Sequence, residues 1–211
     1  MTYPKFISES SRTGPRQFEV PYVLNNLIDG KTIEIGGNSS LFKWVLVRRG
    51  VPFTLIDPMD PSFNNKHNHR LATCIHGDIR KFTPKQLGTF PNVLLVSVLE
   101  HISLPAYGQT KDWKNSPRIE QKKAFEHCLK FVAPGGRIIV TLPHSNKAEE
   151  KDPKFALRYN NEMLEDLQHG HKLIDQKFFR LIQPGYLDRW RQVPVANTIG
   201  ARSNVCFVLE P

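Results

Sequence analysis

Residues 30–60, GKTIEIGGNSSLFKWVLVRRGVPFTLIDPMD, place two short apolar runs on either side of a helix-like segment. The first run, TIEI, is followed by a glycine pair, Gly36-Gly37, and the second, PFTLI, ends at Asp57. Between them, SLFKWVLVRRG has apolar residues at helical spacing and closes at Gly50, a helix stop signal. Strand, glycine loop, helix and strand in this order predict one βαβ unit of a parallel sheet.

The rest of the chain continues this alternation of strands and helices. Further strands are predicted at ATCIH (72–76), NVLLVSV (92–98), RIIVTLP (137–143), HKLIDQKFFRLI (171–182) and NVCFVLE (204–210). Further helices are predicted at residues 17–28, 83–90, 116–132 and 160–170. Because runs such as NVLLVSV are apolar almost throughout, both faces of the sheet should be covered. The expected fold class is α/β: an open, doubly wound, mostly parallel seven-stranded sheet with helices on both faces.

The length of 211 residues suits one well-filled core, which we assign to residues 17–211, with residues 1–16 as an N-terminal lid or flexible segment. No apolar run approaches the roughly 20 residues that cross a bilayer, and no secretory signal is evident. We therefore expect a soluble intracellular protein, cytoplasmic or nuclear, without membrane contact. The formal net charge of +9 favours polyanions such as RNA, although a lysine-rich surface has the same charge.

Polar and glycine residues gather where the predicted strands end. The carboxyl ends of parallel strands meet at one edge of a sheet, and ligands of doubly wound proteins bind there. Two glycines let the backbone turn sharply and approach a ligand. Asp57 lies 23 residues after Glu34, near the spacing of about 20 at which an acid reaches ribose hydroxyls. A carboxylate also repels phosphate, so an adenosine-type ligand with free ribose hydroxyls is indicated.

Five segments, in their order along the chain, resemble class I S-adenosylmethionine-dependent methyltransferases. They are IEIGGNSSLF (33–42), LIDPMD (55–60), HGDI (76–79), LLVSVLEHI (94–102) and FVAPGGRIIVTLP (131–143). The resemblance runs from about residue 17 to the end and implies an antiparallel C-terminal strand and S-adenosylmethionine as the cofactor. The commoner family pattern has glycines where this chain has Asn38 and Ser40.

For the methionine half of the cofactor, the resemblance implies contacts from the first and fourth strand ends. Glu34 would orient the glycine loop and the cofactor's amino group, which the backbone of Gly36, Gly37 and Asn38 would approach. Ser97, Val98 and Leu99 (97–99) would line the floor near the sulfonium. A tight turn without a ligand is the alternative for the glycine pair.

For the adenosine half, the resemblance implies contacts from the second and third strand ends. Asp57 would hold the ribose hydroxyls, and Pro58 and Met59 would pack against the adenine. Asp78 would accept a hydrogen bond from the adenine amino group, while the amide of Ile79 would donate to a ring nitrogen. The two aspartates could instead cap a helix or a turn.

Catalysis would depend on the residues just past the fourth strand. Methyl transfer needs alignment of the acceptor with the S–CH3 bond, and a base only if the acceptor must lose a proton. His101 is the candidate base because an imidazole titrates near pH 6.5. Glu100 would bind substrate or orient His101, unless this pair only packs the loop. We expect no metal, because the histidine pairs lack a nearby third ligand.

These patterns favour a methyltransferase acting on a small molecule or on an anionic macromolecule, RNA among them. The alternative is a catalytically silent, methyltransferase-like binding or scaffold subunit. A nicotinamide-dependent oxidoreductase is disfavoured because the loop lacks the full GxGxxG fingerprint. Residues 103–118 and 183–204, including Trp190, would form the acceptor wall or a small satellite core.

Overall fold

The structure is a computed structural model that describes residues 15–37, 41–59, 70–104, 116–145, 156–183, 189–194 and 203–211. Within these ranges eight strands form one sheet in the order β3-β2-β1-β4-β5-β8-β6-β7. The strands are β1 (Thr32–Ile35), β2 (Phe53–Asp57), β3 (Ala72–His76), β4 (Phe90–Val96), β5 (Val132–His144), β6 (Lys172–Gln183), β7 (Arg189–Val193) and β8 (Ser203–Glu210).

The helices connect the strands in the expected alternation. They are α1 (Arg16–Asn26), α2 (Leu41–Arg48), α3 (Pro84–Leu87), α4 (Pro117–Leu129) and α5 (Asn161–Gln168), with short 3₁₀ turns η3 (Ile79–Lys81) and η4 (Leu99–His101). Arg16, the last residue of the expected lid, is therefore the first residue of α1. None of the helices in the described ranges has the length and apolar character needed to cross a membrane.

The sheet has the doubly wound topology expected from the sequence. β1 pairs in parallel with both β2 and β4, so the strand order reverses between β1 and β4. β3 and β5 extend the parallel part at its two ends. β8 then inserts antiparallel between β5 and β6, which confirms the antiparallel C-terminal strand. The crevice for a ligand in such a sheet lies beside the reversal, at the carboxyl ends of β1 and β4.

One strand more is present than the sequence indicated. β7 has the sequence RWRQV and pairs antiparallel with β6 at the edge of the sheet. Its arginines are exposed and Trp190 is half-buried. Because an edge strand contributes few apolar side chains to the core, its short polar sequence gave no recognisable strand signal.

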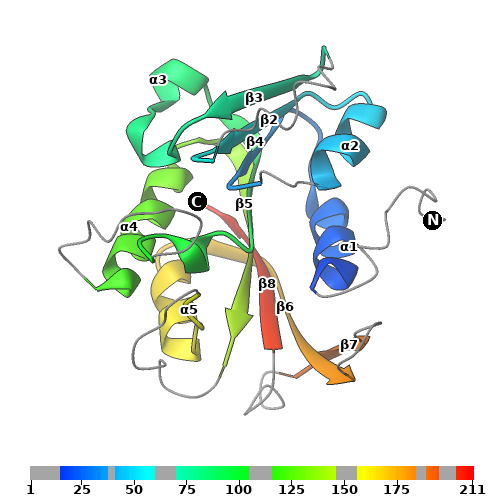
Figure 1. The fold of residues 1–211 in the computed structure, drawn as a ribbon, viewed down its shortest axis with the longest axis vertical. Coiled ribbons are helices and arrows are strands. Elements are labelled where there is room, and N and C mark those ends of the chain that lie inside the picture. The colour runs from blue at the N-terminus through cyan, green and yellow to red at the C-terminus, as the bar shows by residue number, and fades with distance from the viewer. Residues whose placement is uncertain are drawn as a thin grey trace.

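Helices cover both faces of the sheet, with α1 and α2 on one side and α4 and α5 on the other (Figure 1). Successive residues of a strand point to opposite faces. In β4, Leu94 belongs to the same buried cluster as Phe42 of α2, whereas Val93 belongs to the cluster that contains Phe125 of α4. This two-sided burial explains why the central strands are apolar almost throughout.

Candidate functional site

The two glycines of the loop after β1 lie close to other side chains. Gly36 has φ +74°, and a Cβ added there would overlap the Cγ2 atom of Val98. A Cβ on Gly37 would lie 2.5 Å from the carboxyl carbon of Glu34, which is itself buried. The loop therefore folds tightly over the Glu34 carboxylate and against the turn after β4. Because neither residue carries a side chain, the backbone of the loop can itself contact a ligand.

Asp57 ends β2 next to this loop and is 5% exposed. Its Oδ1 atom accepts a hydrogen bond of 2.7 Å from the amide of Met59, which fixes the carboxylate at the strand end. Beyond it the Pro58 carbonyl lies 2.9 Å from Nε2 of His76. Pro58 and Met59 are exposed, so they form an accessible surface beside the buried acid.

Asp78 follows β3, and its carboxylate is already engaged. The Arg80 guanidinium donates to Oδ1 at 3.0 Å and to Oδ2 at 2.5 Å, and Oδ1 also accepts from the Arg80 amide at 2.9 Å. Burial raises the pKa of Asp78, but these bonds from Arg80 outweigh it and leave the pKa below its usual value. The Ile79 side chain lies in the core. A contact of Asp78 with an adenine amino group stays a prediction. In such a contact the Asp78 carboxylate would accept hydrogen bonds from both the adenine and Arg80.

The chain turns sharply after β4. Ser97 has φ +49°, a left-handed conformation that is uncommon for a residue with a side chain. Its amide donates to the carbonyl of Thr141 at 3.1 Å and to the Thr141 hydroxyl at 3.0 Å. Its own hydroxyl donates to Oε1 of Glu19 at 2.6 Å. Hydrogen bonds from two other elements therefore hold this strained turn in place.

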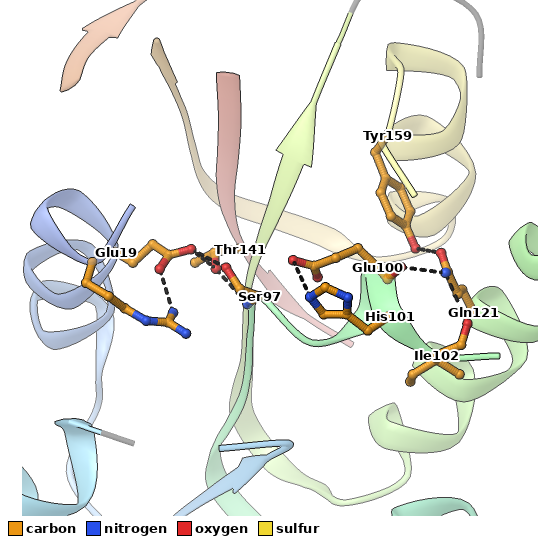
Figure 2. A network of polar contacts seen from close by, with 9 residues as sticks. Glu19, Ser97, Glu100, His101, Ile102, Gln121, Thr141 and Tyr159 are labelled. Carbon is orange, nitrogen blue, oxygen red and sulfur yellow. Dashed lines mark hydrogen bonds and ion pairs between the residues drawn. The ribbon is translucent and has the colours of Figure 1, made fainter. Parts of the chain in front are cut away.

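Glu19 of α1 joins the N-terminal helix to the centre of the sheet (Figure 2). Its carboxylate is fully buried and accepts hydrogen bonds from Ser97 and, at 2.7 Å, from the hydroxyl of Thr141. Its second oxygen pairs with the guanidinium of Arg16 at 2.6 Å. The sequence analysis missed this residue. Its signal was an acid inside the apolar run QFEVPYVL, three residues after an arginine.

Glu100 lies on the next turn, with its carboxylate between Ser97 and His101 (Figure 2). It is 3% exposed, and Oε1 lies 3.9 Å from Nε2 of His101. The other oxygen, Oε2, has no hydrogen-bond partner among the described residues. Burial raises the pKa of Glu100 to about 8, and the charge of Glu19 contributes to the increase. The carboxyl group can therefore gain or lose a proton near neutral pH.

A second buried network fixes the backbone of this turn. The Gln121 side chain of α4 donates to the carbonyl oxygens of Glu100 and Ile102, at 3.1 and 3.2 Å. Tyr159 donates its hydroxyl to Gln121 at 2.6 Å. Leu99 packs entirely in the core, so its side chain anchors the turn. The position of Glu100 is consequently set by groups that do not face the crevice.

The buried charges at this edge are mainly negative. Burial lowers the pKa of Arg16, but the carboxylates of Glu19, Glu34 and Glu100 raise it further, so its pKa lies above the usual value. Glu19 forms an ion pair with Arg16, and Glu34 and Glu100 also act electrostatically on this guanidinium, which is itself partly exposed. Such an arrangement attracts a cation and repels a phosphate.

The structure therefore brings together the expected residues of the first, second and fourth strand ends: Glu34, Gly36, Gly37, Asp57, Ser97, Val98, Glu100 and His101. Asn38 lies outside the described residues, as do residues 1–14 of the expected lid. Within the described ranges, no three His, Cys, Asp or Glu side chains are grouped as metal ligands would be.

Solved structures share this architecture. The CcbJ methyltransferase from Streptomyces caelestis superposes with a TM-score of 0.63 at 14% identity, over 98% of this chain and 99% of its own. A Burkholderia thailandensis 1,6-didemethyltoxoflavin-N1-methyltransferase, solved with its substrate and S-adenosylhomocysteine, gives 0.60 at 11% identity over 96% and 78%. The glycopeptide N-methyltransferase MtfA, solved with S-adenosylmethionine, gives 0.59 at 12% identity over 91% and 85%.

Sequence comparison adds nothing to this likeness, because no protein-family model and no curated protein matches the chain. At such identities a structural likeness shows the fold alone. The topology, the glycine loop after β1 and the shared architecture agree on one fold. The chain has the fold of the class I S-adenosylmethionine-dependent methyltransferases.

Proposed function

We propose that the protein is an S-adenosylmethionine-dependent methyltransferase. The observation that carries this proposal is the set of buried carboxyl groups, Glu34 and Glu100, beside a glycine loop in which a Cβ on Gly37 would meet the Glu34 side chain. S-adenosylmethionine carries positive charge on its sulfonium and its amino group. The dinucleotide of a nicotinamide enzyme would place pyrophosphate there, against like charge.

The residues of this edge suit the parts of that cofactor. The Glu34 carboxylate, under the glycine loop, would hold the amino group directly or by orienting the loop. Asp57 would accept hydrogen bonds from the ribose hydroxyls, and the exposed Pro58 and Met59 would contact the adenine. Oε2 of Glu100 has no hydrogen-bond partner among the described residues, and a cationic ligand would supply one.

When bound, S-adenosylmethionine supplies a methyl group on a cationic sulfur, so the protein has to align an acceptor and exclude water. The fixed turn at residues 97–101 gives both Glu100 and His101 defined positions. Glu100 would accept a hydrogen bond from the acceptor, and His101 would take the proton that the acceptor loses. Oε1 of Glu100 and Nε2 of His101 lie 3.9 Å apart, so both groups could contact the same acceptor atom.

The acceptor is a small molecule or an anionic macromolecule such as RNA. Solved structures with this fold include a 1,6-didemethyltoxoflavin-N1-methyltransferase and a glycopeptide N-methyltransferase. The net charge of +9 supports a polyanion. If RNA is bound, its affinity should fall steeply as salt rises, with a slope set by the number of phosphates contacted. A shallow slope would favour a small acceptor.

The test is a calorimetric titration with S-adenosylmethionine, S-adenosylhomocysteine and NADH. We expect the two adenosyl ligands to bind and NADH to fail. Asp57→Ala should weaken adenosyl binding severely, whereas a folded mutant with unchanged affinity would remove Asp57 from the site. Transfer of a radiolabelled methyl group to RNA, protein or metabolite pools then separates an enzyme from a silent binding subunit.

A further inference from the structure

A cavity of about 240 Å³ lies where the end of β5 and the start of β8 meet β6 and β7. Its apolar walls are Pro15, Pro143, Leu181 and Trp190. Its polar lining comes from Arg158 and from Ser203 and Asn204 at the start of β8. The volume is slightly below that of common ligand pockets, which run from about 300 Å³ upward, and suits a small acceptor.

Two connections tie the lining of this cavity to the elements that hold Glu100 and Glu19. Pro143 follows Thr141 by two residues on β5, so both point to the same face of the sheet, and Thr141 bonds Glu19. On the other side, the amide of Leu157 donates to the Glu100 carbonyl at 2.9 Å, and the amide of Tyr159 donates to the Pro143 carbonyl at 2.9 Å. Arg158, between these two anchors, therefore lies between the acidic turn and the cavity wall.

Contacts within the protein hold the apolar wall in place. Trp190 of β7 stands opposite Leu181 of β6 in the strand register. Its ring packs on Phe18 of α1 at 5.0 Å between centroids, and Phe18 stacks on Phe179 at 4.3 Å. Because the indole is held by neighbouring aromatic rings, it offers a fixed surface against which a flat or branched hydrocarbon can pack.

Charge differs between the two ends of this space. Arg158 is the single charged residue among those that line the cavity in the described ranges. A guanidinium binds a carboxylate through two parallel hydrogen bonds. On the side of the strand ends lie two buried carboxyl groups: Glu100, whose pKa is raised to about 8, and Glu19, which is paired with Arg16. A ligand that spans both regions is best matched if it carries an anionic group at one end and a cationic or proton-donating group at the other.

We propose that the cavity binds the methyl acceptor, and that the acceptor is a small amino acid-like molecule. Its carboxylate pairs with Arg158, its apolar body packs on Trp190, and its amine faces Glu100. This proposal rests on the proposed methyltransferase function. In the reaction, the nitrogen lone pair forms the bond to the methyl carbon, and the S–C bond breaks with its electrons remaining on sulfur. The proton released from nitrogen passes to His101.

The test uses amines in matched pairs that differ only in a carboxylate: tryptophan and tryptamine, phenylalanine and phenethylamine, 4-(aminomethyl)benzoate and benzylamine. Binding to the protein saturated with S-adenosylhomocysteine is followed by ligand-observed NMR. We expect the carboxylated member of at least one pair to bind about tenfold or more tightly than its partner, the range of one charge-assisted contact. The same member should accept a radiolabelled methyl group.

Three variants locate the effect. Arg158→Met should abolish the preference for the carboxylated member, and Arg158→Lys should retain part of it. Arg49→Met removes an exposed arginine beyond α2 and should leave the preference unchanged. S-adenosylhomocysteine affinity and thermal unfolding show whether each variant is folded.

The outcomes separate the two proposals. If the protein binds S-adenosylhomocysteine but no pair shows a carboxylate preference, or if the preference survives Arg158→Met, this inference is wrong and the methyltransferase proposal stands. If S-adenosylhomocysteine itself does not bind, the methyltransferase proposal fails and takes this inference with it. A preference that disappears with Arg158→Met and persists with Arg49→Met supports both.

Discussion

Binding of S-adenosylmethionine should release a proton from Glu100, and S-adenosylhomocysteine should release less. The Glu100 carboxyl is buried, one of its oxygens has no partner among the described residues, and its pKa is raised to about 8. A cation placed beside it stabilises the ionised form and lowers that pKa. The two ligands differ by the charge on sulfur, so their difference isolates the effect of the sulfonium.

The expected size follows from Coulomb's law. A unit positive charge about 5 Å from the carboxylate, at an effective dielectric constant near 20, contributes about 3 kcal/mol, or about two pKa units. With a free pKa of about 8, roughly three quarters of the Glu100 side chains are protonated at pH 7.5. Nearly all of these would ionise in the complex. We therefore expect about 0.7 proton released per S-adenosylmethionine at pH 7.5, and little at pH 9, where the group is already ionised.

The assay is isothermal titration calorimetry in two buffers with different ionisation enthalpies, such as phosphate and Tris. The slope of binding enthalpy against buffer ionisation enthalpy gives the number of protons released. Glu100→Gln cannot ionise and should bring the slope close to zero. Glu126→Gln, on the exposed side of α4, is the matched control and should keep the wild-type slope.

Equal proton release for the two ligands would refute this reasoning, because the sulfonium would then lie too far from Glu100 to be felt. A wild-type slope in Glu100→Gln would assign the proton to another group. Either result would show that Glu100 does not lie at the reaction centre. Neither would contradict the predicted contacts of the adenosine with Asp57, Pro58 and Met59.

Three further predictions address the loop, the base and the buried clamp. Gly37→Ala should weaken S-adenosylhomocysteine binding at least tenfold, because the added methyl group would lie 2.5 Å from the Glu34 carboxyl carbon. Gly50→Ala is the control, since a Cβ there has open space although φ is +75°. It should lower stability by about 1 kcal/mol and leave the affinity unchanged. His101→Ala should lower turnover far more than cofactor affinity in steady-state and binding assays, and equal turnover would discard it as the base. Glu19→Ala should lower the free energy of unfolding in urea by about 3 kcal/mol or more. It leaves the buried Thr141 hydroxyl, the partly buried Ser97 hydroxyl and a guanidinium without their acceptor. A loss below about 1 kcal/mol would contradict the clamp.

Local sequence patterns were enough to predict the parallel part of the sheet. Apolar runs that end at Gly36 and at Asp57 are short-range signals, and the structure has strands at both places. Thr83 was likewise expected to start a helix, and its amide bonds the Gln86 side chain at 2.9 Å at the start of α3. These features depend on neighbours within a few residues, so they can be predicted from local sequence patterns.

The polar clamp of the site could not be predicted in the same way. Glu19 bonds Ser97 and Thr141, which lie 78 and 122 residues further along the chain. Only the packing of α1 against β4 and β5 brings these groups together, and no local pattern of apolar residues indicates that packing. Asp78 was expected either to contact the adenine or to cap a turn, and its side chain caps η3 through the Arg80 amide. The ion pair with Arg80 is local, but the sequence analysis did not predict it.

The most direct measurement is a crystal structure of the protein with S-adenosylhomocysteine. Our account predicts the adenosine ribose within hydrogen-bond distance of Asp57, the amino acid part over Gly36 and Gly37, and the sulfur facing Glu100. A ligand bound elsewhere, or a crevice that stays closed to it at saturating concentration, would contradict the account.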